Sequence, residues 1–112
     1  MAYDEVLARR IHDVLDGEPG VTSRRMFGGL GFMVEGHMAV AAGSSGSLMV
    51  RADPADCEAW VDGASVNPME MRGRPAAGWL LVAGEAVADD ERLRLWVDRG
   101  VAFVRTLPPE EH

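Results

Sequence analysis

Residues 21–51 read VTSRRMFGGLGFMVEGHMAVAAGSSGSLMVR and carry most of the strand signals of the sequence. Short runs of apolar and β-branched residues alternate here with glycine-bearing breaks at residues 28–29, 35–36 and 43–46. Short glycine-containing loops between apolar runs are typical of antiparallel hairpins, because glycine readily adopts the positive φ that tight hairpin turns need. The stretch therefore predicts a meander of three or four antiparallel strands.

Helical patterns lie on both sides of this meander. Residues 4–15 predict a first helix, with Asp4 as its cap and an apolar stripe at helical spacing. Asp53-Pro54 starts a second helix, because aspartate is a favoured cap and the missing N–H of proline costs nothing at the first helical position. Two further strands are predicted at residues 66–71 and 78–82.

The last helix is the clearest element of the sequence. It is predicted over about residues 90–107, with Asp89 as its cap. Its apolar stripe is wide enough to dock on a sheet, and Gly100 within that stripe indicates close approach of a neighbouring element. We expect the helix to pack through Trp96, Val97, Val101 and Val104.

The element order is α–β(3–4)–α–β2–α, in which clusters of strands are separated by helices. This order favours an α+β fold of two layers, with helices packed on an antiparallel sheet of five or six strands. A chain of 112 residues has the common size of one domain, so we expect a single domain over residues 1–112. We expect most of the methionines and tryptophans to lie in its core.

The chain is acidic, with a formal net charge of −7, and all of its basic residues are arginines. This balance argues against nonspecific nucleic-acid binding, which depends on many cations that neutralise phosphates. The arginines are unevenly placed: residues 21–51 hold three against Glu35, and residues 65–82 hold two against Glu70. These segments can form a local basic face on an acidic protein.

Several classes of site and location are disfavoured by the residues present. No apolar run approaches the ~20 residues that cross a bilayer, and the acidic start lacks a signal-peptide pattern. We therefore expect a cytoplasmic protein without membrane contact.

Cys57 is the single cysteine and is interpreted as a small apolar helix residue. His12, His37 and His112 lack metal-ligand spacing, so we expect no metal and no cofactor.

No catalytic motif is visible, and we expect no catalytic residue. The run Gly28-Gly29-Leu30-Gly31 lacks the Gly-Lys-Ser/Thr ending of a nucleotide-binding loop and is followed by a strand pattern instead of a helix. We interpret it as a bend or bulge in a twisted sheet. The serines at 44, 45 and 47 are not part of a nucleophile elbow.

The strongest candidate for a binding surface is a pair of arginine-bearing turns. Arg24-Arg25 enters the glycine bend, and Arg72-Gly73-Arg74 joins the last two strands. Two such turns can converge and hold a carboxylate or phosphate bidentately; the alternative is solvated turns or ion pairs with the acidic helices. Apolar neighbours can supply the anchor of an interaction hot spot. The candidate binding residues are Arg25, Met26, Phe27, Gly28, Gly29, Arg72, Arg74 and Trp79.

The run Arg25-Met26-Phe27-Gly28-Gly29 also carries a family resemblance. Together with Phe32-Met33-Val34, Leu48-Met49-Val50-Arg51, Met71-Arg72-Gly73-Arg74-Pro75 and Trp96-Val97, it resembles the N-terminal domain of the TfoX/Sxy competence-regulator family. The resemblance covers almost the whole chain. It implies a two-layer α+β fold of the secretion-chaperone-like type.

The resemblance also implies a role. Full-length members of that family regulate natural-competence genes together with a cyclic-AMP-responsive transcription factor, and they carry a C-terminal helical domain that a chain ending at His112 is expected to lack. The resemblance therefore implies that this chain is a regulatory or protein-interaction module, whose partner is part of the transcription machinery or a transcriptional regulator. The alternative is a small-anion binder or an enzyme that uses the arginine-bearing turns. We also expect a homodimer, because chaperone-like folds often pair and the edges of small sheets need protection.

Overall fold

The computed structural model describes residues 4–26, 29–43, 46–71 and 74–107. The predicted α+β fold is confirmed, with six strands in one sheet and three α-helices, and a short 3-10 helix was not predicted. In chain order the elements are α1 (Glu5–Val14), β1 (Val21–Met26), β2 (Gly29–Val34), β3 (His37–Ala42), β4 (Leu48–Arg51), α2 (Pro54–Trp60), β5 (Val66–Met71), β6 (Arg74–Val82), η1 (Gly84–Val87) and α3 (Asp90–Val104).

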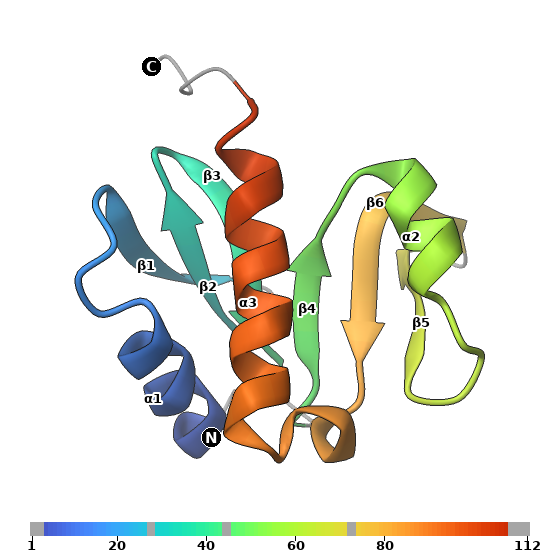
Figure 1. Cartoon of the computed structure of the whole chain (residues 1–112), viewed down its shortest axis with the longest axis horizontal. Helices are drawn as coiled ribbons and strands as arrows, with labels where there is room; N and C mark the ends of the chain where they lie inside the picture. The colour runs from blue at the N-terminus through green and yellow to red at the C-terminus, as the bar shows by residue number, and fades with distance from the viewer. Residues whose placement is uncertain (1–3, 27–28, 44–45, 72–73, 108–112) are drawn as a thin grey trace.

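The six strands form one open antiparallel sheet in the order β1-β2-β3-β4-β6-β5. The first four strands are the predicted meander. The chain then passes through α2 to the far edge of the sheet, where β5 forms a hairpin with β6, and β6 returns to pair with β4. The two edge strands are therefore β1 and β5, which Figure 1 shows at opposite sides of the molecule.

The pairing aligns residues in rows that cross the whole sheet. One row consists of Arg25, Leu30, Ala42, Leu48, Val82 and Val66, and the next consists of Arg24, Gly31, Ala41, Met49, Leu81 and Asn67. Successive residues of a strand point to opposite faces, so these two rows belong to opposite faces of the sheet. The first row supplies much of the hydrophobic core. The second row faces away from that core.

All three α-helices lie on the core face of the sheet (Figure 1). The longest, α3, crosses β3 and β4, and its predicted packing is confirmed because Trp96 and Val101 are each only 7% exposed. It ends at Val104, earlier than the predicted end at 107, and residues 105–107 form a turn. No helix in the described part of the chain is long and apolar enough to cross a membrane.

The predicted helix caps are present. The carboxylates of Asp4, Asp53 and Asp89 each accept a hydrogen bond from a backbone N–H in the first turn of their helix. These bonds satisfy donors that the helix itself leaves unpaired.

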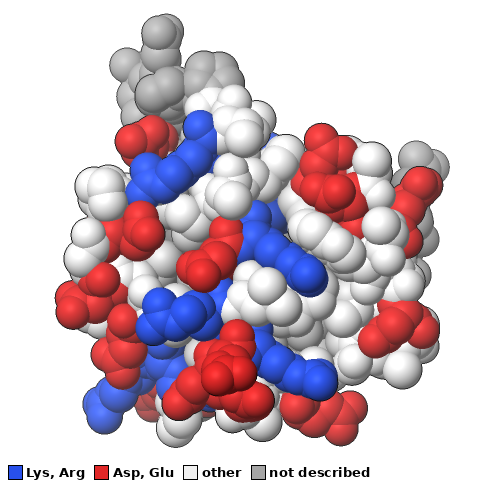
Figure 2. All heavy atoms as spheres, viewed as in Figure 1, with Lys and Arg blue, Asp and Glu red and all other residues white. Residues whose placement is uncertain are grey.

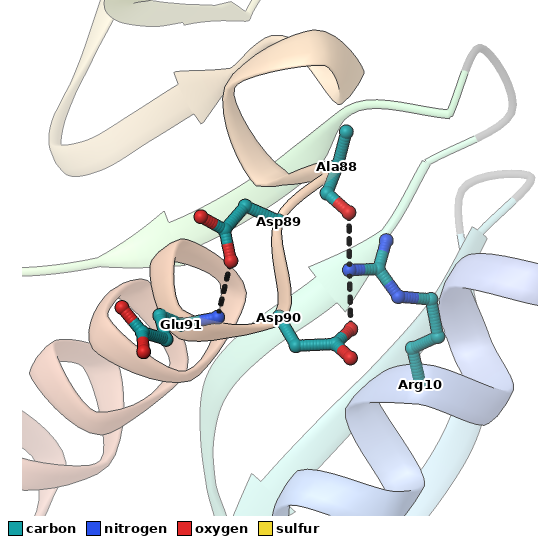
Figure 3. A network of polar contacts seen from close by, with 5 residues as sticks. All are labelled: Arg10, Ala88, Asp89, Asp90 and Glu91. Atoms are coloured by element: carbon teal, nitrogen blue, oxygen red, sulfur yellow. Dashed lines mark hydrogen bonds and ion pairs between the residues drawn. The ribbon is translucent and has the colours of Figure 1, made fainter.

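Two arginines tie the helices to their surroundings. The guanidinium of Arg10 in α1 donates to the Ala88 carbonyl at 3.0 Å and pairs with Asp90 at 2.9 Å, at the start of α3 (Figure 3). At the other end of α3, Arg105 pairs with Glu18 at 2.7 Å and lies 3.7 Å from a carboxylate oxygen of Glu35. These ion pairs link α1, the loop that follows it and the β2–β3 turn to the two ends of α3.

Candidate functional site

The sheet register separates the two strand ends that carry the candidate arginines. Arg25 lies in the row of Val82, whereas Arg74 pairs with Met71 and stands eight residues before Val82 in β6. At about 3.3 Å per residue, the two backbone positions lie roughly 26 Å apart along the strands, and four strand spacings add about 19 Å across the sheet. The register therefore puts the two strand ends at opposite ends of the sheet, which does not favour the expected convergence on one small ligand. The turn residues 27–28 and 72–73 lie outside the described residues, so the convergence stays a prediction.

The candidate binding residues are scattered by this arrangement. Arg25 is exposed near the end of β1, Gly29 is buried at the start of β2, and Trp79 is half-buried in β6. Met26 and Arg74 lie in strands, and their side chains are outside the described part of the structure. The candidates Phe27, Gly28 and Arg72 lie outside the described residues. A binding role for each of these residues stays a prediction.

The face of the sheet opposite the helices is the surface that the sequence interpretation missed. Its side chains alternate along each strand with fully buried core residues such as Val50, Leu80 and Val82. No helix of the described chain covers this face (Figure 1). We name it the methionine face, and its residues are Gly29, Gly31, Met33, Met38, Ala41, Met49, Trp79 and Leu81.

The methionines of this face are not core residues, contrary to expectation. Met33, Met38 and Met49 are half-buried, and Leu81 is 38% exposed, which makes it one of the few exposed large apolar residues among those described. Methionine side chains are flexible and polarisable, so they suit surfaces that adapt to a partner. Strand alternation alone does not reveal which face the helices cover, which is why the sequence did not separate these methionines from the core.

Small residues form the floor beneath these methionines. A Cβ at Gly31 would stand 3.1 Å from the Met38 sulfur, and a Cβ at Gly29 would stand 2.6 Å from the Ala42 carbonyl oxygen and 3.6 Å from the Met49 Cε. Met49 Cε would also be 4.0 Å from a Cβ at Gly43. Ala41 is 1% exposed although it stands outside the core cluster. Met38 and Met49 therefore pack near a strip of small residues, which we call the trough and whose floor we define as Gly29, Gly31, Ala41 and Gly43.

Charge is distributed unequally between the sheet and the rest of the protein. Of 11 basic and 18 acidic residues, the strands contain four arginines and one acid, Glu70, which leaves seven arginines and 17 acids elsewhere. Figure 2 views the helix side, where acidic side chains are spread among arginines. The exposed Arg24 belongs to the row that crosses the methionine face. The strands are therefore more basic than the rest of the chain, but Arg24 and Arg25 stand in rows on opposite faces of the sheet, so a single basic face stays a prediction.

A second cluster joins α2 to α3 on the helix side. The guanidinium of Arg99 lies 4.3 Å from the ring centroid of Trp60 and 4.6 Å from that of Trp96, and the two rings meet edge to face at 5.8 Å. Arg99 and Trp60 border a hollow of about 370 Å³, which Asp53 and Asp56 also line. Because α2 fully buries none of its own residues, this cluster mainly attaches α2 to the fold.

Among the described residues, two titratable groups have shifted pKa values, and neither lies on the methionine face. Burial, with Asp56 and Asp53 nearby, raises the pKa of the Cys57 thiol, which favours the unreactive neutral form. Hydrogen bonds from the N–H groups of Val66 and Ala64 lower the pKa of Asp62. Among the described residues, no three His, Cys, Asp or Glu side chains gather into a metal site.

Comparison with known families gives one match. The model of the TfoX N-terminal domain matches residues 13–104, a span that includes all six strands, α2 and α3. No curated protein and no solved structure matches the chain. The matched span contains every residue of the methionine face.

Proposed function

The chain belongs to the TfoX N-terminal domain family, and we propose that it is a regulatory module that binds a protein partner on its methionine face. The observation that carries the proposal is the helix-free side of the sheet, where half-buried methionines and the exposed Leu81 form an apolar surface on an acidic protein. Contiguous exposed apolar surface on a water-exposed domain marks interaction sites. The family favours a partner in the transcription machinery or a transcriptional regulator.

The alternative function, a small-anion binder or an enzyme that uses the arginine-bearing turns, has weaker support. Bidentate capture of one small ligand needs its arginines within a few ångströms of each other. The strands place Arg25 and Arg74 at opposite ends of the sheet. Each turn would have to bind the anion alone, without the arginines of the other turn on which the hypothesis of a shared site depends.

The test compares capture by three forms of the protein. Leu81→Asp places a charge on the methionine face, and Leu95→Asp is its matched control, because Leu95 is 46% exposed on α3 at the helix side. Immobilised wild type and both variants are incubated with native lysate, and retained proteins are quantified by mass spectrometry. Thermal unfolding confirms that each variant is folded, which we expect because surface substitutions usually change stability by less than about 0.5 kcal/mol.

The proposal predicts a set of proteins retained by wild type and Leu95→Asp and lost with Leu81→Asp. Retention of every captured protein by folded Leu81→Asp would refute it. If Leu81→Asp unfolds, Met49→Gln serves in its place, because glutamine keeps the shape of methionine while making the trough polar. The same two outcomes then decide the proposal.

A further inference from the structure

We infer that the partner presents an acidic, amphipathic segment, which inserts a bulky apolar side chain into the trough and places its carboxylates near Arg24. The inference rests on the proposed function and names the chemistry of the partner. Its first support is steric: the trough floor consists of glycine and alanine, and the side chains that cover it most closely at Gly31 and Gly29 are those of Met38 and Met49.

The cover can be displaced at low cost. Each methionine side chain has three rotatable bonds and no polar partner to lose, so it can move aside without leaving an unsatisfied group. A Leu, Met or aromatic side chain of the partner would then occupy the space over Gly31, where all three nearest atoms belong to the Met38 side chain. Backbone at this glycine is approachable because no Cβ intervenes. The trough therefore suits one large apolar anchor.

The second support is charge. The row that crosses the trough begins with the exposed Arg24 in β1 and contains no acidic residue. The acids are concentrated outside the strands, and an acidic segment on the methionine face therefore avoids most of the repulsion that it would meet elsewhere on the protein. Charge complementarity of this kind mainly sets the specificity and rate of association.

The same charges disfavour a second copy of this chain as the occupant. Two copies joined by their methionine faces would each bring Arg24, and no carboxylate, to the row that crosses the trough. Alternatively, one copy could dock its acidic helix side on the methionine face of another, but its own methionine face would then stay uncovered. Such head-to-tail contacts build an open chain of copies unless the rotation between them closes a ring. The occupant favoured by the charges is therefore a different polypeptide.

The test uses random peptides displayed on phage, selected on the immobilised full chain and depleted on Leu81→Asp. We expect the enriched peptides to carry net negative charge and at least one Leu, Met, Phe or Trp. A synthetic copy of an enriched peptide should bind Arg24→Glu about tenfold more weakly, with Arg92→Glu on α3 as the matched control, because Arg92 is also exposed. A version of the peptide with its acids changed to lysine should regain binding to Arg24→Glu.

A second readout reports on the trough itself. In protein labelled with ¹³C at the methionine methyl groups, the Met38 and Met49 signals should shift on addition of the peptide. Basic enriched peptides, equal binding to Arg24→Glu and wild type, or unshifted Met38 and Met49 signals would each overturn the inference.

The outcomes separate the inference from the proposed function. If Leu81→Asp abolishes capture from lysate but no enriched peptide binds through Leu81, the inference of an acidic segment is refuted and the methionine face remains the proposed interaction surface. If neither peptide binding nor capture from lysate depends on Leu81, the inference and the proposed function are both refuted. Light scattering covers the remaining occupant: twice the 12.1 kDa chain mass for wild type and a single mass for Leu81→Asp would identify a second copy and overturn the inference.

Discussion

Gly100 of α3 lies directly against the backbone of Ala39 in β3. A Cβ at Gly100 would stand 2.6 Å from the Ala39 carbonyl oxygen and 3.0 Å from a methyl group of Val40. Glycine costs about 1 kcal/mol relative to alanine within a helix, so its presence here needs a reason. The close approach of α3 to the sheet supplies that reason, and it confirms the interpretation of Gly100 made from the sequence.

Gly100→Ala should therefore destabilise the protein although it improves helix propensity. The added methyl group meets backbone, which cannot move aside as a flexible side chain can, and overpacking of this kind costs typically about 1–3 kcal/mol. Urea unfolding measures the change in the free energy of unfolding. An increase in stability would show that α3 does not sit this close to β3.

Arg99→Ala should loosen the attachment of α2. The Arg99 guanidinium contacts both Trp60 and Trp96, and cation–π contacts are worth about 0.5–2 kcal/mol depending on their desolvation. We expect a loss of that order in the free energy of unfolding, together with a change in tryptophan fluorescence. Arg92→Ala, on the exposed side of the same helix, is the control and should change neither. Equal effects of the two substitutions would contradict the role of the cluster.

Asp62 should contribute to stability at neutral pH and lose that contribution in acid. Its carboxylate accepts hydrogen bonds from the N–H groups of Val66 and Ala64, both at 2.8 Å, which lower its pKa from the ordinary value of 3.8. A depressed pKa in the folded state means that the stabilisation is present above the unfolded pKa and fades as pH falls through the folded one. The melting-temperature difference between wild type and Asp62→Ala should therefore narrow below about pH 4. A difference that is constant from pH 7 to pH 3 would contradict this account.

Cys57 should react slowly with thiol reagents at neutral pH. Burial, and after it the charges of Asp56 and Asp53, raise the pKa of its thiol above the ordinary 9.0, so little thiolate is present at pH 7. The rate of reaction with a disulfide reagent should rise steeply only in alkaline solution. Asp56→Asn removes one of the negative charges and should make the reaction faster at a given pH. No acceleration would show that burial alone protects the thiol.

The helices were predictable because their signals are local. Asp4, Asp53 and Asp89 cap their helices as the sequence indicates, since a cap and the bonds it makes lie within a few residues. The stripe of α3 likewise identified Trp96 and Val101 as core residues.

The sheet order and the site depend on contacts that the sequence does not encode locally. The insertion of β6 between β4 and β5 joins residues more than 25 positions apart, such as Leu48 and Val82. The same long-range pairing sends Arg25 and Arg74 to opposite ends of the sheet. A methionine at an alternating position can face either side of a strand. Only the placement of the helices shows that Met38 and Met49 belong to the uncovered one.

If the methionine face is the partner-binding surface, a bound partner protects its methionines from oxidation. Peroxide is added to the free protein and to the protein bound to its captured partner, and mass spectrometry follows the oxidation rate of each methionine. The account predicts that Met33, Met38 and Met49 oxidise several-fold more slowly in the complex, because the partner excludes the oxidant from their half-buried side chains. Unchanged oxidation rates at all three methionines in a saturated complex would place the partner elsewhere and contradict the claim.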